Sequence, residues 1–274
     1  MRILIPTDFS ELSNVAIKYS VDLSKDIDIQ LILLHVIDTN APSRARIGSQ
    51  KLQEAIKTSS ENSMKELIAS IKNDNSHNID ISYEITSGSS IEKYVEIFAL
   101  KNNIDMICIG TKGASGLKKI LFGSNAAGII QNSSIPVLTI PEFARYKGIN
   151  NIVYSSDLYN LEKEIDLIIP FAKLMDSWIQ ILHIDKDNER FEGDLQQKEE
   201  SLRKDFSYQK INFIELKSSS VIHGVNTFVA DVDADMVIMF THHTNFLEKV
   251  FQKSVTQNTA FQTRIPLFTF QKES

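Results

Sequence analysis

The chain has 274 residues, of which 42% are hydrophobic and 23% are charged, so it is long enough for two α/β domains of ordinary globular composition. Its net charge of −6 argues against the broad basic face of proteins that bind nucleic acid or anionic membranes. The single cysteine excludes an internal disulfide, and no apolar run approaches the about 18 residues of a membrane helix. Because the chain opens directly on a strand pattern, we expect a cytoplasmic protein with no nucleic-acid or membrane partner.

The first half alternates strand and helix patterns. A short apolar segment at 2–7 precedes a helical pattern that begins near Ser10, and the continuous apolar run 29–37 predicts a strand buried on both faces. The patterns that follow predict a long helix at about 50–71, a strand at 79–85, a turn at 87–90 and a helix at 91–100. They then predict a strand at 105–109, a short helix at 125–131 and a last strand at 137–140. This alternation predicts a doubly wound, five-stranded parallel sheet with right-handed crossovers.

A glycine-punctuated stretch follows the fourth predicted strand. Gly110, Gly113 and Gly123 can take positive φ and carry no Cβ, so backbone amides can approach an anion closely. Ser124 and Asn125 suit a helix N-cap, where free amides and the helix dipole favour a phosphate. The spacing is neither that of a P-loop nor that of the dinucleotide fingerprint. An ordinary glycine-rich connection without a ligand stays as the alternative.

The spacing closely resembles the nucleotide-binding motif of the universal stress protein family. Two further segments agree in the same order: residues 3–10 resemble that family's first strand and acidic turn, and residues 33–38 resemble the end of its second strand. The resemblance implies a Rossmann-like, adenine nucleotide alpha hydrolase-like fold. All three segments lie at predicted strand ends, beyond which the ligands of open parallel sheets bind.

Family members with the complete motif bind ATP, so the resemblance implies ATP, with or without Mg²⁺, as the ligand. It implies that Asp8 meets the ribose or the adenine edge and that the backbone of Val36 meets adenine, while the glycine loop meets the sugar and phosphates. Asp8 could equally cap the first helix, and this role is compatible with ligand binding. The implied binding residues are Pro6, Thr7, Asp8, Val36, Ile109, Gly110, Lys112, Gly113, Gly123, Ser124 and Asn125.

The second half repeats the first. Asp157 follows Asp8 by 149 positions, and His183 follows His35 by 148. Later matches lie 130 positions apart, so the repeat is shorter in its middle, where the long second helix is predicted. We therefore expect two tandem domains of the same doubly wound, five-stranded parallel type, at residues 1–141 and 150–274.

The second domain has lost the glycine loop. At the offset of 130, the three glycines are replaced by Phe240, His243 and Lys253. Of the positions compared, only Ser124 is retained, as Ser254. Side chains then stand where the backbone should meet phosphate, so we expect a degenerate domain and a nucleotide in the first domain only. His242 and His243 are neighbours in a loop without further ligands, so we expect no metal site.

The sequence favours an ATP-binding tandem universal stress protein that acts as a nucleotide-responsive stress or regulatory factor. A scaffold that binds no nucleotide and a weak ATPase are the alternatives. We expect no catalytic residues, because no base or acidic pair is placed beside the loop, although slow ATP hydrolysis stays open. Single-domain family members commonly dimerise through the last strand, which implies an internal pseudo-dimer along strands 137–140 and 266–270 and leaves a homodimer open.

Overall fold

The computed structural model describes residues 1–39, 49–75, 77–111, 124–186, 193–241 and 264–271. These residues form two compact units, and the boundary falls within one strand: the first unit ends at Leu138 and the second begins at Thr139. The domain limits expected from the repeat, 1–141 and 150–274, remain a prediction. Among the described residues, no helix combines the length and the apolar character needed to cross a membrane.

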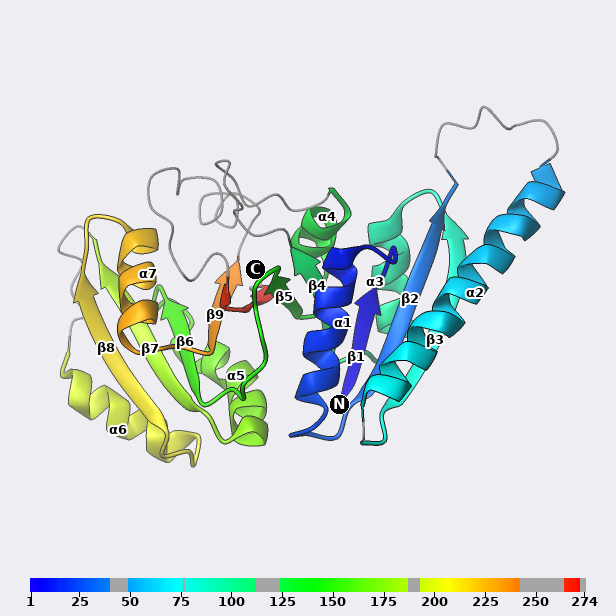
Figure 1. Ribbon diagram of the computed structural model, residues 1–274. Coiled ribbons are helices and arrows are strands. Elements are labelled where there is room, and N and C mark those ends of the chain that lie inside the picture. The colour runs from blue at the N-terminus through cyan, green and yellow to red at the C-terminus, as the bar shows by residue number, and fades with distance from the viewer. Residues whose placement is uncertain (40–48, 76, 112–123, 187–192, 242–263, 272–274) are drawn as a thin grey trace. The chain divides into compact units, whose positions relative to one another are not determined.

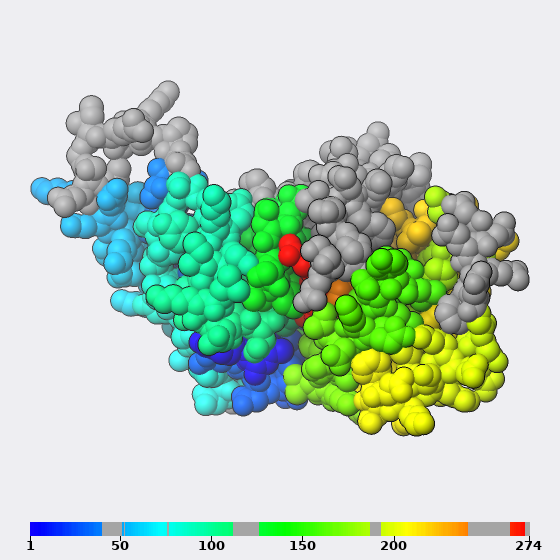
Figure 2. Space-filling model, turned by 180° about the vertical axis from the view of Figure 1, so that it is seen from behind, coloured from blue at the N-terminus to red at the C-terminus, as the bar shows by residue number. Residues whose placement is uncertain are grey.

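The first unit is a parallel sheet with the strand order β3-β2-β1-β4-β5 (Figure 1). Its elements are β1 (Arg2–Pro6), α1 (Glu11–Leu23), β2 (Gln30–Asp38), α2 (Ser49–Asp74), β3 (Asp80–Gly88), α3 (Ile91–Lys101), β4 (Met106–Thr111), α4 (Ser124–Asn132) and β5 (Val137–Pro141). Helices α1 and α2 cover the face that points to the viewer in Figure 1. Helix α3 covers the other face, and its turquoise surface is seen from behind in Figure 2.

The second unit repeats this arrangement, with the strand order β8-β7-β6-β9-β10. Its elements are β6 (Asn151–Ser156), α5 (Leu161–Met175), β7 (Trp178–Asp185), α6 (Leu195–Asp205), β8 (Ile211–Lys217), α7 (Val221–Asp231), β9 (Met236–Thr241) and β10 (Leu267–Gln271). Helix α6 has 11 residues where α2 has 26, so the repeat is shortened in its middle as expected. The prediction of two doubly wound parallel domains is confirmed.

The central strands are buried on both faces, as their continuous apolar sequences require. Ile3, Leu4 and Ile5 in β1 have no solvent-accessible side-chain surface, and the corresponding centre of β6 is equally buried. Cys108 lies in the buried part of β4, and burial raises the pKa of its thiol to about 12. Cys108 is therefore a buried thiol that stays protonated at neutral pH.

The predicted turn at 87–90 is shorter than expected. Strand β3 pairs with β2 along its whole length, up to the pair of Asp38 and Gly88. Pairing with β2 therefore extends β3 through Thr86, Ser87 and Gly88, which the hydrophobic pattern does not assign to a strand. Only two residues remain before α3, and the second of them, Ser90, caps that helix with its side chain.

Two predictions around the glycine stretch were wrong. Strand β4 extends to Thr111, so Gly110 lies within a strand rather than in a loop. Helix α4 begins at Ser124, so Asn125 lies inside the helix and is not its N-cap. Hydrophobic patterns locate the centre of an element better than its ends, because end residues contact solvent and loops.

Candidate functional site

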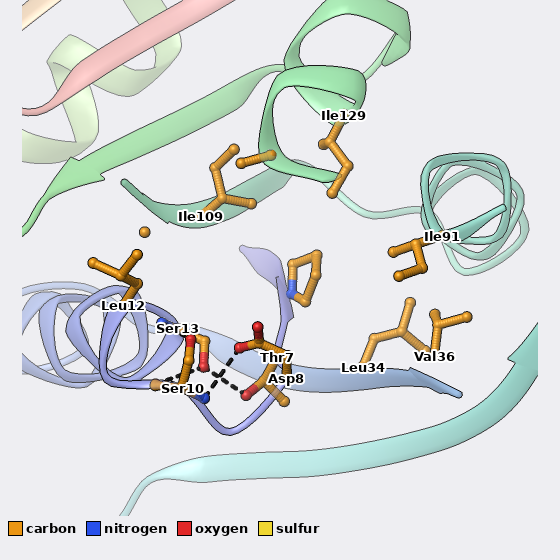
Figure 3. A pocket seen from close by; sticks show the side chains of 13 residues that line it. Thr7, Asp8, Ser10, Leu12, Ser13, Leu34, Val36, Ile91, Ile109 and Ile129 are labelled. Atoms are coloured by element: carbon orange, nitrogen blue, oxygen red, sulfur yellow. Dashed lines mark hydrogen bonds between the residues drawn. The ribbon is translucent and has the colours of Figure 1, made fainter. Parts of the chain in front are cut away.

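A pocket of about 350 Å³ lies at the carboxyl ends of β1, β2 and β4 in the first unit (Figure 3). This volume is within the usual range of small-molecule sites, about 300–1,000 Å³. Six of the residues predicted from sequence line it together: Pro6, Thr7, Asp8, Val36, Ile109 and Gly110. They come from three separate strand ends, so the fold brings together segments that are up to about a hundred positions apart in the chain.

The other five predicted residues lie in or next to segments outside the described residues. Lys112, Gly113 and Gly123 are outside the described residues. Ser124 and Asn125 begin α4, and their side chains are not among those described. The following residues of α4, Ala126 and Ile129, do line the pocket, so the start of this helix adjoins it.

The turn between β1 and α1 forms one wall of the pocket, and its own side chains hold it in shape. The Thr7 hydroxyl accepts the Phe9 amide at 3.1 Å and donates to the Ser13 hydroxyl at 3.0 Å. Asp8 Oδ1 accepts the Ser10 amide at 3.0 Å. Phe9 takes a left-handed backbone conformation with φ of 63°, which is uncommon for a residue other than glycine.

Asp8 is not the cap of the first helix. That role belongs to Ser10, whose side chain accepts the Ser13 amide. Burial raises the pKa of Asp8, but hydrogen bonds from the Ser10 side chain and amide outweigh it, so the pKa lies below its usual value. Asp8 is therefore an ionised carboxylate at neutral pH, and its two oxygens can accept further hydrogen bonds beside those from Ser10.

The backbone of Val36 is directed into the same space. The Leu34 carbonyl accepts the Thr7 amide at 2.9 Å, so the backbone groups of Leu34 face β1. Because strand residues alternate, those of Val36 face the same side. The pairing of β1 with β2 ends at Pro6 and Leu34. Val36 therefore offers one N–H and one C=O past the end of β1, as its predicted role requires.

Sequence reasoning missed much of the apolar wall. Five apolar residues that were not predicted also line the pocket: Leu12, Leu34, Ile91, Ala126 and Ile129. The polar residues Ser10 and Ser13 were missed as well. Figure 3 shows Ile91, Ile109 and Ile129 arranged around one side of it, across from Asp8. A signal existed for α4, because Ala126 and Ile129 are three positions apart and so share a helix face.

Gly110 has a role that its sequence context did not reveal. A Cβ atom at this position would overlap the Leu12 carbonyl oxygen of α1 and come within 2.7 Å of the Leu12 carbonyl carbon. Among the described glycines, positive φ occurs at Gly148 and Gly193, and not at Gly110. The expectation that Gly110 supplies positive φ was wrong, because close packing of β4 against α1 is what excludes a side chain there.

The first half of the chain matches known proteins. The model of the universal stress protein family matches residues 1–141. Universal stress protein MJ0531 of Methanocaldococcus jannaschii is 30% identical over 141 residues, which cover 51% of this chain and 81% of that protein. Universal stress protein MJ0577 of the same organism is 32% identical over 152 residues, with 51% and 93% covered. The chain belongs to the universal stress protein family.

The universal stress protein fold extends beyond the matched half. The crystal structure of a universal stress protein from Archaeoglobus fulgidus has a TM-score of 0.74 to this chain, at 17% sequence identity. The likeness covers 99% of this chain and 98% of that one. At this identity it shows a shared fold alone, and that fold has the tandem arrangement.

The second unit builds its first turn in the same way. The Ser156 hydroxyl accepts the Leu158 amide at 3.0 Å, and Asp157 Oδ1 accepts the Tyr159 amide at 3.1 Å. Leu158 has φ of 65°, close to the value at Phe9. Asp157 therefore organises a turn, as Asp8 does in the first unit.

The two strand-end histidines are also architectural. His35 Nδ1 donates to the Thr7 carbonyl oxygen at 2.8 Å, and His183 Nδ1 donates to the Ser156 carbonyl oxygen at 3.3 Å. Each imidazole therefore ties the end of one strand to the turn after its neighbour. The two histidines therefore make equivalent contacts in the two units.

In the second unit, Phe240 stands at the position of Gly110 and lies in an aromatic cluster. The Phe240 ring stacks on Phe270 with centroids 4.9 Å apart, and it meets the Tyr154 ring edge-on at 5.8 Å. A bulky side chain thus occupies the position where the first unit has only backbone. The changed positions His242, His243 and Lys253 and the retained Ser254 lie outside the described residues.

Proposed function

We propose that the first unit binds an adenine nucleotide, ATP with or without Mg²⁺, and that the protein acts as a nucleotide-responsive stress or regulatory factor. The observation that carries this proposal is the convergence of the Asp8 carboxylate, the Val36 backbone and the end of β4 on one pocket. The resemblance to nucleotide-binding family members implies an adenosine contact at each of these places.

The chemistry of the pocket suits each part of such a ligand. Val36, Ile109 and Ile129 offer an apolar surface to a planar base, and the Val36 backbone offers it one donor and one acceptor. The Asp8 carboxylate can accept hydrogen bonds from ribose hydroxyls. The beginning of α4 supplies free amides and the positive end of a helix dipole, which favour phosphate.

We also propose that the nucleotide binds in the first unit alone. The turn residues are equivalent in both units, but Phe240 and its aromatic neighbours replace the bare backbone of Gly110 in the second. The internal pseudo-dimer along the last strands, the open alternative of a homodimer and the cytoplasmic location stay predictions from resemblance and composition.

The two aspartates provide a matched pair of variants to test this site. Asp8→Ala and Asp157→Ala each remove the same hydrogen bond to the amide two positions on, so their local structural costs are similar. Only Asp8 lines the pocket. Titration calorimetry with ATP, with and without Mg²⁺, should give about one site per chain. Affinity should fall at least about tenfold in Asp8→Ala and stay unchanged in Asp157→Ala.

Other results would assign a different function. Equal losses in the two variants would place the nucleotide outside this pocket. A wild-type protein that neither releases a nucleotide on denaturation nor binds added ATP would favour the scaffold. Conversion of bound ATP to ADP in the same samples would favour the weak ATPase.

A further inference from the structure

Strand β3 is an open edge of the first unit. It is the end strand in the order β3-β2-β1-β4-β5 and is nine residues long. Ser82, Tyr83 and Glu84, at its centre, are all exposed. Long exposed edge strands present unpaired backbone groups that can pair with another strand, so proteins usually shorten, cover or charge them.

The hydrogen bonds of β3 show which of its backbone groups point outward. The Gly88 carbonyl accepts the Thr39 amide at 3.0 Å, so the backbone groups of Gly88 face β2. By strand alternation, the amides and carbonyls of Ile81, Tyr83 and Ile85 face away from the sheet. Within the described part of the chain, nothing hydrogen-bonds to the outward groups of these three residues.

The corresponding edge of the second unit is covered. There Glu199 Oε2 of α6 accepts the Phe213 amide of β8 at 2.8 Å, and Arg203 Nε donates to the Ile211 carbonyl oxygen at 2.8 Å. Glu199 and Arg203 also pair with each other at 2.8 Å. Phe213 and Ile211 are the counterparts of Tyr83 and Ile81, so the same outward groups are satisfied in one unit and open in the other.

The sequence of β3 is self-complementary about Tyr83. In an antiparallel pair centred on this residue, Tyr83 faces Tyr83 of a second copy, and Ile81 faces Ile85. Aromatic pairs and pairs of β-branched residues stabilise neighbouring strands. All three residues carry the outward backbone groups, so each of these pairs also forms hydrogen bonds between the two copies.

The charges of β3 fit the same pairing. In this register the carboxylate of Asp80 faces Thr86 of the second copy, and that of Glu84 faces Ser82. No carboxylate therefore faces another carboxylate, although like charges directly opposite each other would weaken the pair. The strand has no lysine or proline that would block an added strand.

The first turns of α2 supply a second observation. Every described side chain from residue 51 to residue 59 is exposed, whereas Ser60, Met64 and Ile71 further along the helix are buried. Ile56 continues this buried stripe by one turn and is 42% exposed. In Figure 1 this end of α2 leans away from the sheet, beyond β3. Short isolated helical segments are marginal in water, so an apolar stripe here calls for a partner.

A second copy satisfies both features together. We propose that two copies of this chain associate through their β3 edges, antiparallel and centred on Tyr83. The two-fold axis of such a pair is perpendicular to the sheet, so both α2 helices lie on the same face. Each overhanging end then projects over the neighbouring copy, where Ile56 finds apolar surface.

The symmetry allows a sharp test by analytical ultracentrifugation of the full chain. Tyr83→Lys and Tyr83→Glu each place like charges opposite each other at the two-fold axis. Each variant alone should associate at least about tenfold more weakly than the wild type. An equimolar mixture of the two should regain dimers, because lysine then faces glutamate. Tyr159→Lys is the matched control, since Tyr159 is 81% exposed in the second unit, and it should dimerise like the wild type.

Three results would overturn the proposal. The first is a wild type that sediments as a monomer at every concentration. The second is a Tyr83→Lys variant that dimerises as strongly as the wild type, which would assign the interface to another surface. The third is a mixture that stays monomeric, since charge reversal restores association only where residue 83 faces its own copy. Circular dichroism of each variant verifies that the chain is folded.

Discussion

Gly110 is the residue at which strand packing and the pocket depend on each other. It lines the pocket together with Leu12, and the absence of its Cβ allows β4 to pass directly beneath the Leu12 carbonyl. A side chain at this position has to push the first turn of α1 away from the sheet. The pocket wall formed by Asp8 and Ser13 continues into that turn, so the shape of the site depends on this contact.

Gly110→Ala should therefore lower both stability and nucleotide affinity. Forcing an extra carbon into a packed region costs about 1–3 kcal/mol, and the obstacle here is backbone that cannot rotate away. Urea denaturation should show a lower midpoint, and titration with ATP should show weaker binding.

Gly128→Ala is the control, because the atoms nearest to the added carbon belong to the Glu92 side chain, which can turn aside. Alanine also favours the helix in which Gly128 lies. Its denaturation midpoint should stay at or above that of the wild type. An equal loss in both variants would contradict the role given to the Leu12 carbonyl.

The place of a single residue could be predicted where it depends on the neighbouring sequence, and not where it depends on contacts with distant segments. The family resemblance could place Asp8 and Val36 in the site, because Asp8 follows β1 and Val36 lies near the end of β2, and both strands have a plain apolar pattern. The positive φ of Phe9 could not, because no glycine or asparagine announces it and side-chain hydrogen bonds of Thr7 and Asp8 impose it. The contact between Gly110 and Leu12 joins distant segments, which no local pattern reveals.

Among the elements, the helices after the second strand of each unit differ most. Helix α2 is long and its first described turns are exposed, whereas α6 is short and uses Glu199 and Arg203 to cover β8. The repeat offset located this difference in the sequence. Its consequence for the sheet edges could not be predicted, because it depends on which side chains reach the outward backbone groups.

Glu199→Ala should destabilise the second unit by about 1–3 kcal/mol. It removes the acceptor of the Phe213 amide, and Phe213 is buried at 7% exposure, so water replaces the lost hydrogen bond poorly. Thermal denaturation followed by circular dichroism measures the loss. Glu200→Ala, at the exposed neighbouring position, should change stability by no more than about 0.5 kcal/mol. Comparable effects of both substitutions would indicate that helix charge, and not edge capping, is responsible.

The strands themselves were well predicted, and their ends were not. Apolar runs located the central strands β1, β2 and β4 of the first unit, because parallel strands are covered on both faces. Strand β3 continues past Ile85 through Thr86, Ser87 and Gly88, since pairing with β2 stabilises these polar residues in an extended conformation. Its exposure on both faces explains why the hydrophobic signal was weak there.

At the scale of the whole molecule, two units of one fold carry different chemistry at the same place. Both have the same hydrogen-bonded turn after the first strand, the same histidine near the end of the second strand and the same strand order. They differ at Gly110 and Phe240, where backbone in one corresponds to an aromatic cluster in the other. A ligand that binds the first unit alone should therefore stabilise the two units unequally.

The single tryptophan makes this inequality measurable. Trp178 begins β7, so its fluorescence follows unfolding of the second unit, while far-ultraviolet circular dichroism follows both. ATP at 100 times its Kd stabilises the unit that binds it by about 2.7 kcal/mol. The melting temperature of the first unit should rise by several degrees in circular dichroism, with little change in the fluorescence transition. Asp8→Ala should abolish the rise. A shift in the fluorescence transition alone would place the nucleotide in the second unit.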